Sequence, residues 1–185
     1  MIEGLGGNFS TFKPKVNLTV EGMLSKPSQA VRRFSPDAPR VDTTRFKFDM
    51  SGSPERVSIT GLSASMDAMN GAQVKIRNGR GRMARLEGKF LVDAIELAFE
   101  ITTPQTAWIA TSRGMTLPEL GPTVATGRLT GDQNVLEARE LKITNGEPGT
   151  HKAEISGTIS SIGILKKPGV VGGLDLRFSA ETTSN

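Results

Sequence analysis

Apolar and polar residues alternate along most of the chain, so that in many short runs every second side chain is apolar. These runs cover, in chain order, residues 16–20, 46–50, 57–66, 74–76, 84–90, 95–101, 125–129, 136–143, 153–159 and 174–180. A period of two residues is typical of a β-strand with one apolar face, and about ten such runs predict an all-β protein. No run has the three- to four-residue apolar spacing of a convincing amphipathic helix.

The breaks in this pattern predict bulges, turns and loops. The alternation slips at Gly61 and again between Leu136 and Leu141, which predicts two β-bulges. Two stretches with little apolar pattern, 25–40 and 105–120, are predicted to be long loops. The predicted tight turns lie at Asn78-Gly79, Asp132-Gln133-Asn134, Asn145-Gly146 and Pro168-Gly169.

Nearly every predicted strand has one apolar and one polar face, which is the pattern of an antiparallel sheet with one side in water. The apolar side needs a cover, which a second sheet, a closed barrel or a ligand could supply. In a two-sheet β-sandwich, Phe46, Phe48, Phe99 and Phe178 would be ordinary core residues. The alternation does not distinguish between these covers.

Two segments of the chain resemble one another. Residues 75–79 and 142–146 both end in Asn-Gly, and each is followed by further alternating runs. A repeat of about 70 residues favours a linear array of strands over a closed globule. We therefore divide the chain into N-terminal strands with a proline-containing loop (1–50), a first repeat unit (51–116) and a second repeat unit (117–185).

Composition narrows the chemistry. There is no cysteine, which excludes disulfides, thiolate nucleophiles and cysteine-based zinc sites. Basic residues exceed acidic ones by 23 to 19, an imbalance too mild to indicate a polyanion partner by itself. No segment approaches the ~18 apolar residues of a membrane span, and the N-terminus lacks the basic and apolar regions of a signal peptide. We expect either a cytoplasmic protein or part of a longer exported chain.

Candidate catalytic groups are sparse. The single histidine, His151, has no nucleophile or carboxylate at motif spacing, and we expect a solvated loop residue. Glu96 and Glu100 share the polar face of one predicted strand, where no desolvated pocket would separate their pKa values. We therefore expect no enzyme activity, no catalytic residues, no cofactor and no metal site.

One basic cluster stands out on the polar side. Its members are Lys75, Arg77, Arg80, Arg82, Arg85 and Lys89. No aromatic side chains lie among these charges as stacking platforms, so we expect no nucleic-acid partner. The alternatives are a solvated strand face and contact with anionic lipid head groups at the rim of a groove.

Three stretches resemble the AsmA family of bacterial envelope proteins, which includes TamB-like and YhdP-like members. They are residues 51–62, residues 117–131, and residues 141–146 together with 155–159 and 173–178. The resemblance implies an elongated, curved, mostly antiparallel sheet that forms an apolar groove. It also implies periplasmic exposure, with anchoring to the inner membrane through segments outside this chain. The implied function is conduction of phospholipid toward the outer membrane, in support of outer-membrane assembly and homeostasis, with envelope proteins as further partners.

This leads to a predicted set of groove-lining residues. They are Phe46, Phe48, Val57, Ile59, Val74, Ile76, Leu86, Phe90, Ile95, Leu97, Phe99, Ile143, Ile155, Ile159, Leu174, Leu176 and Phe178. The alternative to a lipid-conducting groove is a self-contained β-sandwich that serves as a binding or scaffold module without lipid cargo.

Overall fold

A computed structural model describes residues 15–25, 41–53, 55–68, 71–86, 89–104, 121–146, 151–163 and 170–182. Nine strands form in this part of the chain. They are β1 (Val16–Ser25), β2 (Val41–Ser53), β3 (Arg56–Ala68), β4 (Gln73–Leu86), β5 (Lys89–Thr103), β6 (Thr123–Gly131), β7 (Val135–Asn145), β8 (His151–Gly163) and β9 (Val171–Thr182).

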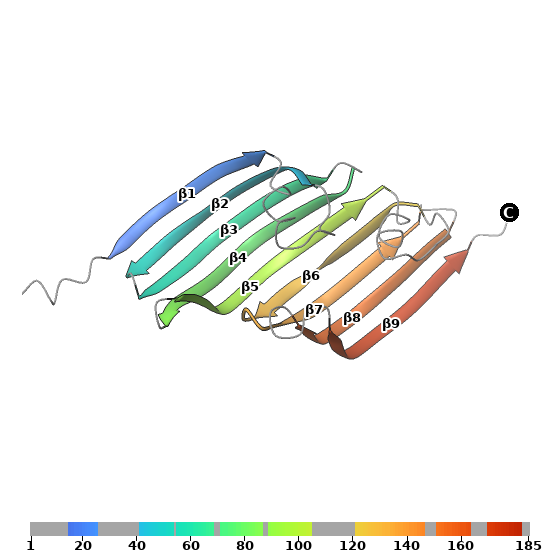
Figure 1. Ribbon diagram of the computed structural model, residues 1–185. Coiled ribbons are helices and arrows are strands. Elements are labelled where there is room, and N and C mark those ends of the chain that lie inside the picture. Colours follow the sequence, from blue (N-terminus) through green and yellow to red (C-terminus); the bar gives the residue numbers. More distant parts are fainter. Residues whose placement is uncertain are drawn as a thin grey trace, which may run out of the picture.

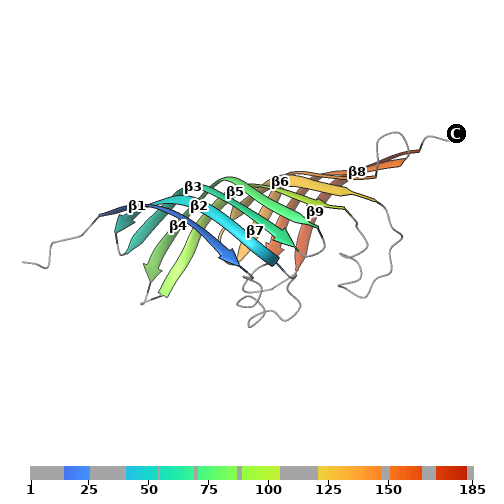
Figure 2. The same cartoon turned by 90° about the horizontal axis from the view of Figure 1, so that it is seen from above.

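The nine strands form one antiparallel sheet in which every strand pairs with the next along the chain (Figure 1). The sheet is arched, and its two edge strands, β1 and β9, do not meet (Figure 2). The predicted all-β class and the elongated, curved sheet are therefore confirmed. The described strands make a single sheet and not the two facing sheets of a β-sandwich.

The turn between β6 and β7 follows from local side-chain chemistry. The Asp132 carboxylate accepts hydrogen bonds from the backbone N–H groups of Asn134 (2.6 Å) and Val135 (3.0 Å). The Asp132 N–H in turn donates to the Val135 carbonyl at 3.0 Å. Aspartate favours turns because its short side chain bonds to the backbone in this way. The predicted turn at 132–134 is confirmed.

Both predicted bulges are present. Gly61 has a φ of 61°, and the β2–β3 register shifts between Lys47 and Asp49, opposite this glycine. Glu140 has a φ of 52°, and the β7–β8 register shifts between Ala138 and Leu141. Each bulge restores the alternation, so that the apolar side chains before and after it share one face.

Predictions about one turn and one strand boundary are wrong. Asn78-Gly79 is not a turn but lies inside β4, where Asn78 has a φ of 52° and the β4–β5 register shifts. Asparagine before glycine supports a positive φ, which a bulge requires as much as a hairpin does. The runs 84–90 and 95–101 are not separate strands, since β4 ends at Leu86 and β5 continues from Lys89 to Thr103. The alternation persisted by chance across the β4–β5 connection.

Several predictions lie wholly or largely outside the described residues. These are the loops at 25–40 and 105–120 and the turn at Pro168-Gly169. The division into 1–50, 51–116 and 117–185 stays a prediction. The two Asn-Gly sites of the predicted repeat take different positions in the sheet. Asn78-Gly79 lies in the middle of β4, whereas Asn145 is the last residue of β7. No helix in the described part of the chain is long and apolar enough to cross a membrane.

Candidate functional site

One face of the sheet collects the apolar side chains of all nine strands. Cross-strand pairing defines a row that crosses the whole sheet, because directly paired residues point to the same side. From β1 to β9 this row is Leu24, Thr44, Met66, Val74, Ile101, Ala125, Ile143, Ile155 and Phe178. Thr44 is its only polar member. We call this side of the sheet the apolar face.

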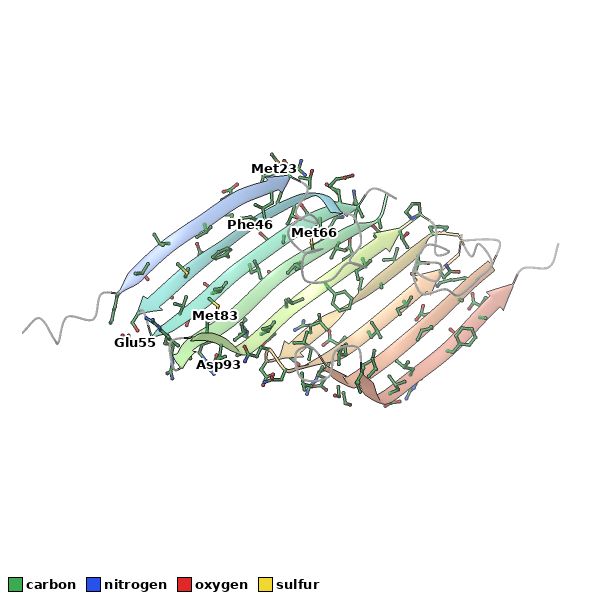
Figure 3. The ribbon with its side chains drawn as sticks, in the orientation of Figure 1. Met23, Phe46, Glu55, Met66, Met83 and Asp93 are labelled. Carbon is green, nitrogen blue, oxygen red and sulfur yellow. The ribbon has the colours of Figure 1, made fainter. Side chains whose placement is uncertain are left out.

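The predicted groove residues whose side chains are described all lie on the apolar face. Pairing joins Phe48 to Val20 at one end of the sheet, and Leu97 to Leu129 near the middle. The side chains of Leu86 and Phe90 are outside the described part. In the β4–β5 register Leu86 pairs with Lys89 and Arg85 pairs with Phe90, so the two positions alternate, and the prediction that they share one face is wrong. The same face also holds apolar residues absent from the predicted set, namely Leu18, Val20, Met50, Leu62, Met66, Met83, Leu129 and Leu141. Figure 3 labels Phe46 of the predicted set and Met66 and Met83 of the additional residues.

Aromatic and leucine side chains lie flat over glycines on neighbouring strands. A Cβ added to Gly22 would lie 2.7 Å from the Phe46 ring, and one added to Gly127 would lie 2.9 Å from the Phe99 ring. Leu62 covers Gly79 in the same way, at 2.8 Å. Glycine leaves room for a large neighbour to fold down onto the sheet. The apolar face is therefore low in relief at these three positions.

Nothing in the described part of the chain covers this face. The buried hydrophobic residues there are only Ala72, Ala138 and Leu141, and no large side chain is fully enclosed. On the edge strand β9, Phe178 is 70% exposed and Leu174 is 61% exposed. Soluble proteins rarely leave so continuous an apolar surface in water unless it binds something.

The opposite face is polar and is held together by ion pairs between neighbouring strands. Lys75 and Arg77 of β4 reach Glu100 of β5 at 3.2 and 3.6 Å. Further along the same two strands, Arg80 pairs with Glu96, and Arg82 pairs with Asp93 at 2.9 Å. Four members of the predicted basic cluster are thus matched by carboxylates, so their charge is largely neutralised locally. Exposed pairs of this kind contribute at most about 1 kcal/mol each, but they favour the native β4–β5 register.

The cavities in the polar face are shallow. One, of about 690 Å³, lies over Ser63 and Ser65 of β3, between the long side chains of Arg45 and Lys47 and those of Lys75 and Arg77. Short serine side chains between long basic ones produce this depression. Its basic residues pair with Glu21, Asp67 and Glu100, so it is not a strongly cationic site.

The candidate catalytic residues do not converge. Glu96 and Glu100 are engaged with the basic residues of β4, as described above. His151 is the first residue of β8 and pairs with Thr182, so the expectation of a loop position is wrong. The Arg139 guanidinium donates to Glu137 at 2.9 Å and lowers the pKa of that carboxyl, whereas a general acid needs a raised one. No cluster of three metal-ligating side chains exists among the described residues.

Comparison of the chain with protein-family models, with curated proteins and with solved structures finds no match.

Proposed function

We propose that the apolar face binds the acyl chains of phospholipids and that the chain is an AsmA-like segment of a lipid-conducting protein of the bacterial envelope. In this proposal the segment is exposed to the periplasm and passes lipids between the inner and outer membranes. The polar face meets water, and the function needs no covalent chemistry.

One observation carries the proposal. A row of paired side chains, apolar at every position except Thr44, crosses all nine strands and has no cover in the described part of the chain. Each CH₂ group removed from water contributes roughly 0.8 kcal/mol, so an acyl chain gains several kcal/mol by lying along such a surface. In a bilayer the acyl chain is already shielded from water. A protein surface that shields it comparably lets a lipid leave the membrane without a prohibitive hydrophobic cost.

The low relief of the face fits transport better than tight retention. Rings folded over Gly22 and Gly127 fill the space that a side chain at these positions would otherwise line. A lipid would therefore be held by contact area and not by a specific pocket. Such binding tolerates different acyl chains and permits movement across successive strands.

Native mass spectrometry of the chain purified without detergent tests this function. We expect adducts with the masses of diacyl phospholipids, and renewed loading when the delipidated chain is incubated with vesicles of phosphatidylethanolamine and phosphatidylglycerol. A chain that stays bare after incubation with vesicles would instead indicate a scaffold or binding module without lipid cargo.

A further inference from the structure

No described segment pairs with the outer edge of β9. The strand has 12 residues, contains no proline or lysine, and pairs only with β8. Exposed edge strands are usually protected by proline, by charged side chains, by bulges or by a covering segment. The charged residues of β9 are Asp175, Arg177 and Glu181. Gly173, with a φ of 64°, distorts only the beginning of β9, and Leu174 to Thr182 remain in regular register with β8.

The backbone at this edge is oriented to receive another strand. A Cβ added to Gly157 of β8 would collide with the carbonyl oxygen of Asp175, so this carbonyl points toward β8. Successive residues of a strand direct their N–H and C=O groups to opposite sides. The polar backbone groups of Leu174, Leu176 and Phe178 therefore point away from the sheet.

The side chains of β9 are complementary to themselves in an antiparallel register. Leu174-Asp175-Leu176-Arg177-Phe178 reads apolar, acidic, apolar, basic, apolar. A two-fold axis at Leu176 would place Asp175 of each copy opposite Arg177 of the other copy. It would also place Leu174 of each copy opposite Phe178 of the other. Asp175 and Arg177 face the uncharged Thr158 and Ser156 of β8 and make no ion pair within the described part of the chain.

We propose that two copies of this chain associate through β9, in this register, to form one continuous sheet. A two-fold axis perpendicular to the sheet keeps both apolar faces on the same side. The dimer would thus extend the apolar face across 18 strands, twice the nine of one chain. The other edge lacks this complementarity, because β1 carries Glu21 as its one charged residue, and Glu21 already lies 3.7 Å from Lys47. This association does not require bound lipid.

Sedimentation velocity of charge variants tests the register. The unmodified chain is expected to sediment with twice the mass of one copy. Arg177→Asp places acidic residues opposite one another across the axis and should weaken the dimer about tenfold or more. The matched control, Asp175→Arg combined with Arg177→Asp, exchanges the two charges and should restore it. A monomeric unmodified chain, a dimer unaffected by Arg177→Asp, or a double variant that stays monomeric would overturn the proposal.

Single-cysteine cross-linking tests which edge is used. The chain has no native cysteine, so Leu176→Cys introduces a unique thiol beside the axis. Paired antiparallel residues lie within the Cα separation that a disulfide spans. Oxidation should link Leu176→Cys into a covalent dimer. Leu18→Cys, at a similarly exposed position on the β1 edge, should stay monomeric; the reverse result would overturn the proposed interface.

Discussion

Replacing Leu97 by aspartate is expected to abolish lipid loading while the sheet stays folded. Leu97 lies on β5, near the middle of the apolar face, and pairs with Leu129 of β6. In the lipid-free protein a carboxylate here can stay hydrated, because nothing in the described part of the chain covers this face. An acyl chain lying over it would strip that water from an unpaired charge, at a cost of several kcal/mol. Native mass spectrometry and thermal unfolding measure the two effects.

Ala98→Asp is the matched control for this variant. Ala98 is the next residue of β5 but faces the polar side, where it pairs with Arg77 on β4 and Arg128 on β6. A carboxylate between two arginines should be tolerated there, and lipid loading should persist. Equal loss of lipid in both variants would contradict the assignment of faces. Gross unfolding of Leu97→Asp alone would show that another layer closes over the apolar face.

Replacing Gly157 by alanine should destabilise the sheet by about 3 kcal/mol. Gly157 has a φ of 147°, a conformation that residues with a Cβ rarely adopt. Its added methyl group would also strike the backbone oxygen of Asp175, which cannot move without breaking the β8–β9 pairing. Urea unfolding followed by circular dichroism measures the loss, and hydrogen exchange should show β9 losing protection first.

Gly172→Ala provides the comparison within the same pair of strands. The nearest atom to a Cβ at Gly172 is the Ser161 Cβ at 4.0 Å, an ordinary van der Waals separation. This variant should unfold within about 0.5 kcal/mol of the unmodified chain, since alanine slightly restricts the unfolded state and meets no clash here. Equal destabilisation by the two substitutions would refute the steric argument for Gly157.

The apolar face was predictable from the sequence because side-chain direction in a strand alternates locally. Val74 and Ile76 lie on one side of β4 for the same reason that Lys75 and Arg77 lie on the other. The bulge at Gly61 was also predictable, since the shift in alternation coincides with a residue that tolerates positive φ. The bulge at Asn78 was not, because Asn-Gly supports both a bulge and a hairpin turn.

Long-range pairing accounts for most of what the sequence could not specify. The partner of Arg77 is Glu100, and their approach depends on the β4–β5 register and not on any local pattern. Alternation also leaves open what covers an apolar face, because a strand in a sandwich and a strand in an open sheet have the same period. The uncovered face and the self-complementary edge at Leu176 became visible only once the strands were placed side by side.

Photocross-linking along β5 tests the central claim most directly. A benzophenone amino acid is placed in turn at Leu97, Ala98, Phe99 and Glu100, and the protein is irradiated with phospholipid vesicles. Because these positions alternate between the two faces, lipid adducts should form at Leu97 and Phe99 and be weak or absent at Ala98 and Glu100. Equal labelling at all four positions, or labelling confined to Ala98 and Glu100, would contradict lipid binding on the apolar face.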